Sequence, residues 1–223
     1  MPTITNTDIG LVLFELGLVT RYDNVFFIPN LEVRELILEY IKKHIFKNGK
    51  NFQDTLVPHL FNKNIRQFFL SLKDFFGSLP INFNTEYRYQ LIMYTLLNMY
   101  RGEPKDIGME GSGGSGRYDL RIDFPGKKVG YIFELKLVSF KKNLSLVDFV
   151  HSAKEGLDQI KDTGSWDCYL GKVYKDDIDI FFIAGIAFYR KSFFVLYEKR
   201  KMINGKVDDE PVETGHFNHT KFN

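Results

Sequence analysis

The stretch from Gly116 to Ser139, GRYDLRIDFPGKKVGYIFELKLVS, constrains the fold of this 223-residue chain more than any other. Its first half alternates apolar and charged residues, which is the pattern of a β-strand with one buried face. PGKK then supplies turn-forming residues, and GYIFELKLV has the nearly continuous apolar character of a central strand. We therefore expect a β-hairpin. The alternation places Tyr118, Leu120, Ile122 and Phe124 on one face and Arg117, Asp119, Arg121 and Asp123 on the other.

Two charged residues, Glu134 and Lys136, interrupt the apolar second strand. They are two residues apart, so their side chains point to the same face. Burying both is costly unless they pair with each other or bind something. Asp119 and Glu134 could converge on a hard cation, which prefers oxygen ligands, with Lys136 beside it. The alternative is that Glu134 and Lys136 form a purely structural ion pair.

The pattern of Asp119, 14 intervening residues and ELK resembles the PD-(D/E)XK nuclease superfamily. SGRYDL resembles the entry to the second motif of that superfamily. Ala153–Ile160 (AKEGLDQI) resembles its helix after the core, and Ile183–Lys191 (IAGIAFYRK) resembles its next core strand. The resemblance implies an α/β fold with a restriction-endonuclease-like core, whose mixed central sheet is flanked by helices. It also implies a DNA endonuclease that hydrolyses phosphodiester bonds with Mg2+ or Mn2+.

The same resemblance assigns roles to five residues. Asp119, Glu134 and Glu86 would bind the metal, Lys136 would orient the nucleophile, and Gln159 would support the site. Glu86 stands in EYRYQ, at the start of a predicted helix where the family carries a glutamate. The alternative for Glu86 is a favourable interaction with the helix dipole, and for Gln159 an ordinary solvated side chain.

Residues 106–116, DIGMEGSGGSG, precede the hairpin. Glu110 matches another glutamate that the family commonly has before its GRxD sequence, although the glycine-rich stretch is longer than usual. GSGGSG also resembles an engineered linker. We expect a flexible loop beside the active site. It is not a phosphate-binding loop, because no Lys-Ser/Thr follows it and the next element is a strand.

The run LGLVT…FFIPNLEVRELI resembles the N-terminal part of one branch of this superfamily. In that branch the nuclease-like domain often follows an AAA-ATPase-like domain, but this chain has no GxxxxGK[ST] phosphate loop. The chain is therefore expected to be a stand-alone member or a piece of a larger protein. The branch includes inactive modules, some in cytoplasmic incompatibility factors of endosymbionts. The alternative function is an inactive module of a bacterial toxin or effector that binds nucleic acid or a protein partner.

The hydrophobic pattern predicts three regions packed as one globular unit: an N-terminal helical layer (1–83), a nuclease-like core (84–203) and a polar, loosely packed C-terminal tail (204–223). Leu56, Leu60, Ile65, Phe68, Phe69 and Leu72 are expected to point inward. Helices are expected at 8–18, 31–46, 84–100 and 144–161, with one or two more within 51–76, and further strands are expected at 178–188 and 193–198.

Composition narrows the functional classes. A net charge of +2 does not by itself indicate nucleic-acid binding. No apolar run reaches about 18 residues and no signal peptide is evident, so we expect no membrane segment. The single cysteine, Cys168, excludes an internal disulfide framework. These features predict a cytoplasmic protein. The resemblance implies a bacterial protein, cytoplasmic or secreted as an effector, with DNA as its partner. The oligomeric state stays open.

Overall fold

The computed structural model describes residues 20–22, 25–27, 52–78, 85–100, 102, 105–113, 116–139, 144–162, 178–203, 206–208 and 210–220. The chain forms two compact units, Met1–Lys50 and Asn51–Asn223. In the first unit, strands β1 (Thr20–Tyr22) and β2 (Val25–Phe27) pair antiparallel. The helices predicted at 8–18 and 31–46 lie outside the described residues. The second unit holds all the remaining described elements.

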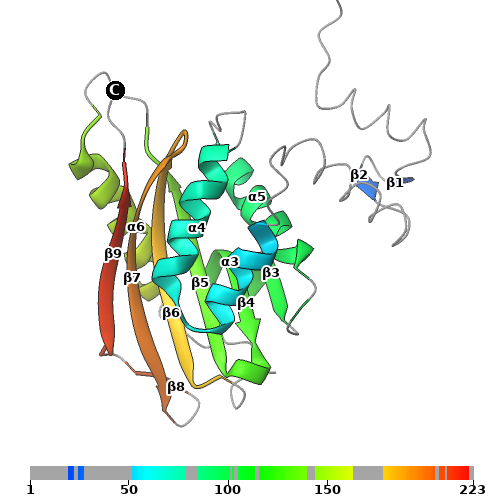
Figure 1. Ribbon diagram of the computed structural model, residues 1–223, viewed down its shortest axis with the longest axis vertical. Helices are drawn as coiled ribbons and strands as arrows, with labels where there is room; N and C mark the ends of the chain where they lie inside the picture. The colour runs from blue at the N-terminus through cyan, green and yellow to red at the C-terminus, as the bar shows by residue number, and fades with distance from the viewer. Residues whose placement is uncertain are drawn as a thin grey trace, which may run out of the picture. The chain divides into compact units, whose positions relative to one another are not determined.

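The described part of the second unit contains a seven-stranded sheet in the order β3-β4-β5-β6-β7-β8, with β9 also paired to β7 (Figure 1). Strands β5 and β6 are parallel and the other pairs are antiparallel, so the sheet is mixed. With its flanking helices this confirms the predicted α/β class. The strands are β3 (Asp106–Gly113), β4 (Gly116–Phe124), β5 (Val129–Leu137), β6 (Ile180–Tyr189), β7 (Ser192–Ile203), β8 (Lys206–Val207) and β9 (Glu213–His219).

Helices cover both faces of this sheet. On one face, Phe68 of α4 stacks on Phe133 of β5, with ring centroids 5.7 Å apart. On the other face, Phe149 and Ala153 of α6 pack with Ala187 of β6. Figure 1 shows α3 and α4 running across the first face. All six residues between 56 and 72 that we expected to point inward are buried, which confirms that prediction. The helices are α3 (Phe52–Phe61), α4 (Ile65–Ser78), α5 (Glu86–Met99) and α6 (Leu146–Asp162).

The predicted hairpin is formed by β4 and β5. A short 3-10 turn, η1 (Pro125–Lys127), joins them, and Lys128 adopts a left-handed backbone with φ 52°. The predicted alternation fails at one residue. Ile122 pairs with Tyr131 on the face covered by α3 and α4, whereas Tyr118 packs against the cluster of Ile132 and Leu157 beneath α6. Strict alternation was therefore wrong for Tyr118, which lies beyond the point where the β4–β5 ladder ends at Leu120↔Phe133.

Two segments predicted to be irregular are strands. Residues 106–113, expected to be a flexible loop, form β3 and pair with β4. Residues 213–219 of the predicted polar tail form β9 and pair with β7. In β9, Phe217 is buried against Phe193, with ring centroids 5.6 Å apart. Both predictions were wrong because an edge strand is stabilised by its neighbour's backbone and a few buried contacts, which override weak local propensity.

Candidate active site

The site begins with two charged side chains on the central strand β5. Nζ of Lys136 lies 2.9 Å from Oε1 of Glu134. Glu134 is only 3% exposed, because β5 lies between β4 and β6 in the middle of the unit. Its second oxygen, Oε2, is buried and has no hydrogen-bond partner among the described residues. Such an atom is costly in a folded protein unless something else binds it.

Asp119 reaches the same region from β4. Its Oδ2 accepts a hydrogen bond of 2.7 Å from the backbone N–H of Leu135. The β4–β5 ladder ends at the pair Leu120↔Phe133. The Asp119 carboxylate therefore binds a β5 amide just beyond the end of the ladder. This contact brings Asp119 next to Glu134 in space, although the two residues are 15 positions apart in sequence.

Glu86 lies in the first turn of α5 and reaches the same strand two residues further on. Its Oε2 accepts a hydrogen bond of 3.3 Å from the backbone N–H of Leu137. The amides of Leu135 and Leu137 lie along one edge of β5, because alternate residues of a strand direct their amides to the same side. Two carboxylates thus occupy successive amides on that edge.

Gln159 reaches the site from α6. Its Oε1 accepts a hydrogen bond of 2.7 Å from Nζ of Lys136. Glycines allow the close approach of helix and sheet that this contact needs. A Cβ at Gly185 would overlap the carbonyl oxygen of Ala153, and a Cβ at Gly156 would lie 3.3 Å from the carbonyl oxygen of Glu134. The side of α6 that carries Gln159 therefore faces the site and is not simply solvated.

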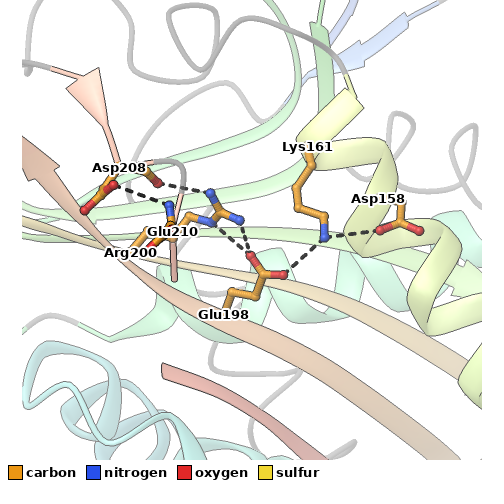
Figure 2. A network of polar contacts seen from close by, with 6 residues as sticks. All are labelled: Asp158, Lys161, Glu198, Arg200, Asp208 and Glu210. Atoms are coloured by element: carbon orange, nitrogen blue, oxygen red, sulfur yellow. Dashed lines mark hydrogen bonds and ion pairs between the residues drawn. The ribbon is translucent and has the colours of Figure 1, made fainter. Parts of the chain in front are cut away.

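A second polar network attaches the C-terminal turn of α6 to the sheet (Figure 2). Nζ of Lys161 lies 3.1 Å from Oε1 of Glu198 and 3.2 Å from Oδ1 of Asp158. Glu198 also accepts a hydrogen bond from Arg200, which in turn donates a hydrogen bond of 3.0 Å to the carbonyl oxygen of Asp208. Because Lys161 and Gln159 are two residues apart, this network restrains the segment of helix that contacts Lys136.

The charges at the site perturb one another. Burial, followed by the neighbouring charge of Asp119, raises the pKa of Glu134 from its ordinary value to about 7, even though Lys136 opposes the shift and Glu86 adds to it. Burial lowers the pKa of Lys136, but its hydrogen bond to Glu134 and the nearby carboxylates outweigh this, so the net shift is upward. A carboxyl group whose pKa lies near neutral pH, next to a fully charged ammonium, is typical of sites that bind ligands or transfer protons.

The donor set suits a hard divalent cation in its chemistry. Glu86, Asp119 and Glu134 offer carboxylate oxygens, and Oε2 of Glu134 lacks a partner among the described residues. Across those same residues, no three His, Cys, Asp or Glu side chains are gathered so that they could hold a metal ion. Asp119 and Glu86 each direct one oxygen to a β5 amide, so metal binding would require them to turn.

The structure brings together Asp119, Glu134, Lys136, Gln159 and Glu86, all five of the residues proposed from sequence. The side chain of Glu110 lies outside the described part of β3. One further residue was missed: Nε2 of Gln90 donates a hydrogen bond of 2.8 Å to the backbone carbonyl of Asp119. The available signal was its spacing of four from Glu86, which puts both on one side of α5.

Comparisons with family models, curated proteins and solved structures find no match to this chain. No helix in the described ranges is long and apolar enough to cross a membrane. The fold and the site define an α/β protein with a mixed sheet, which carries two buried acids, Asp119 and Glu134, beside one lysine.

Proposed function

We propose that this protein is a metal-dependent nuclease that hydrolyses phosphodiester bonds, with DNA as the expected substrate and a restriction-endonuclease-like core. One observation carries the proposal. Nζ of Lys136 is held between Oε1 of Glu134 and Oε1 of Gln159, in a cluster with Asp119 and Glu86. A purely structural ion pair needs neither the additional carboxylates nor a buried oxygen that lacks a partner in the described part of the chain.

Each residue has a chemical role in this proposal. Glu134, Asp119 and Glu86 would hold Mg2+ or Mn2+. The bound ion would supply Lewis acidity toward a phosphate oxygen. Lys136 would orient the attacking water or offset the negative charge that grows on the phosphate. Gln159 is an uncharged acceptor, so it would direct the ammonium without neutralising it.

A second candidate is an inactive nuclease-like module that binds nucleic acid or a protein partner. It is favoured by the hydrogen bonds that Asp119 and Glu86 make to the amides of Leu135 and Leu137. Each bond occupies one oxygen of its carboxylate without a metal, as a site that never binds metal would require. The two candidates differ in one respect: in the nuclease, a divalent cation replaces those amides as the partner of the two carboxylates, and in the inactive module it does not.

The test is cleavage of supercoiled plasmid, linear DNA and RNA in Mg2+ or Mn2+, with EDTA as the blank. Asp119→Ala should lose cleavage by about a hundredfold or more, because it removes a metal ligand. Asp179→Ala is the matched control, since it removes an exposed aspartate, whose Oδ1 lies 3.5 Å from Nζ of Lys128. If wild type and Asp119→Ala cleave equally, the activity does not come from this site. If neither cleaves but DNA is retained, the inactive module is favoured.

A further inference from the structure

Gln90 is a buried polar residue with no role in the proposed chemistry. Its side chain is 2% exposed and lies on α5, one turn after Glu86. Its Nε2 donates to the backbone carbonyl of Asp119 at 2.8 Å. A buried amide that loses its partner is destabilising, so this contact constrains the conformation of both residues.

The hydrogen bond falls where β4 leaves its pairing with β5. On one side, the pairs Met109↔Leu120 and Gly111↔Tyr118 keep a single register with β3 across Asp119. On the other side, the ladder with β5 ends at Leu120↔Phe133. The direction of the Asp119 backbone at this point therefore depends on a contact from outside the sheet. The carbonyl and the side chain share one Cα, so fixing the first limits where the second can point.

The spacing of the two helical contacts matches the strand that they serve. Glu86 and Gln90 are separated by a rise of about 6 Å along α5. The amides of Leu135 and Leu137 are separated by about 6.6 Å along β5. Glu86 binds Leu137 directly, whereas Gln90 acts on Leu135 through Asp119, whose Oδ2 accepts the Leu135 N–H.

We propose that Gln90 is a positioning residue, which fixes the backbone at Asp119 and thereby the direction of the Asp119 carboxylate. The positioning role stands on the contacts alone, and its effect on catalysis rests on the proposed nuclease function. A neutral donor is required here, because a carboxylate at this position would repel both the carbonyl oxygen and the acidic cluster.

The test compares Gln90→Met with Tyr89→Phe. Methionine keeps a similar volume but cannot donate the hydrogen bond. Tyr89 is the neighbouring residue on α5, and its hydroxyl donates a hydrogen bond of 2.7 Å to the carbonyl of Arg190. Tyr89→Phe therefore also removes one hydrogen bond from the helix to a backbone carbonyl, but it leaves the contact to Asp119 in place. Amide hydrogen exchange is measured by NMR in the metal-free protein, at Leu135 and at Leu137.

In Gln90→Met the hydrogen of the Leu135 amide should exchange about tenfold faster than in wild type, while the exchange rate of the Leu137 amide should change by less than about threefold. Tyr89→Phe should change both amides equally or not at all. If Gln90→Met does not fold, Gln90→Asn serves instead, because its amide is one methylene too short to reach the carbonyl. Unchanged Leu135 exchange in the folded variant, or the same change in Tyr89→Phe, overturns the proposal.

Cleavage and Mn2+ binding, measured on the same proteins, distinguish failure of the positioning role from failure of the nuclease proposal. If wild type cleaves DNA, Gln90→Met should lower kcat about tenfold or more with little change in KM, as expected for a misplaced metal ligand. If wild type neither binds Mn2+ nor cleaves, but Gln90→Met still releases Leu135 selectively, the positioning role stands and the nuclease proposal fails.

Discussion

Nζ of Lys136 donates a 2.7 Å hydrogen bond to Oε1 of Gln159, which joins the central strand β5 to helix α6 across 23 residues of sequence. The same ammonium lies 2.9 Å from Oε1 of Glu134. An ammonium has three donors, and these two contacts use two of them. Only one of the two partners, Glu134, is an acid, so Gln159 leaves the charge of Lys136 unchanged.

The close packing of α6 on the sheet should be sensitive to a single methyl group. Gly185→Ala places a Cβ against the carbonyl of Ala153 and 2.5 Å from the backbone nitrogen of Leu157. We expect a loss of about 1–3 kcal/mol in the free energy of unfolding, measured in urea. Gly77→Ala on α4 meets nothing within 4 Å and should instead gain about 0.5–1 kcal/mol. Equal stability of Gly185→Ala and wild type would contradict the close approach.

Stability should depend on pH through Glu134. In the unfolded chain the Glu134 carboxyl group has its ordinary pKa of 4.5, whereas in the folded protein its pKa is about 7. Between these values the folded state binds more protons, so the free energy of unfolding should fall as pH rises, by about 3 kcal/mol in all. Above the folded pKa this contribution should level off. The measurement is urea unfolding in EDTA across this range.

Glu134→Gln is the control for that prediction. Glutamine keeps the shape of the side chain but does not titrate, so the part of the slope that belongs to Glu134 should disappear. Other buried acids, such as Asp123, whose pKa is raised chiefly by burial, will keep their own contribution in both proteins. An identical slope in wild type and Glu134→Gln would show that Glu134 does not titrate in this range.

Divalent cations should stabilise the folded protein. Millimolar Mg2+ or Mn2+ should raise the melting temperature, because a ligand that binds only the folded state stabilises it by mass action. The shift should be larger near pH 8 than near pH 5.5, since a protonated Glu134 cannot bind the cation. Glu134→Gln should show a much smaller shift. A melting curve unchanged by either metal would favour the inactive module.

The sequence predicted those parts of the fold that local periodicity specifies. The alternation around Leu120 and Ile122 indicated the first hairpin strand, and the spacing of Phe68, Phe69 and Leu72 indicated an inward helical face. Strands β3 and β9 were missed, because β3 is glycine-rich and β9 is polar, so their own composition does not indicate the pairing with β4 and β7.

The residues of the site were likewise predictable where a local pattern marks them, and not where they depend on packing. Glu134 and Lys136 were predictable, because two charges at a spacing of two in an apolar strand need a joint explanation. The hydrogen bond of Gln159 to Lys136 depends on how closely α6 approaches the sheet, which sequence spacing does not report. The contact of Gln90 with the Asp119 carbonyl depends on where β4 leaves its ladder, and no residue pattern marks that point.

The most direct test of the proposed function is the initial rate of plasmid cleavage by Lys136→Ala, measured with its affinity for Mn2+. Lys154→Ala, which removes the same charge from an exposed position on α6, is the control. Lys136→Ala should cleave about a hundredfold more slowly or worse, because it loses transition-state charge stabilisation. It should bind Mn2+ as tightly as wild type or more tightly, because a nearby positive charge is gone. Cleavage by Lys136→Ala at the wild-type rate would contradict the proposed site.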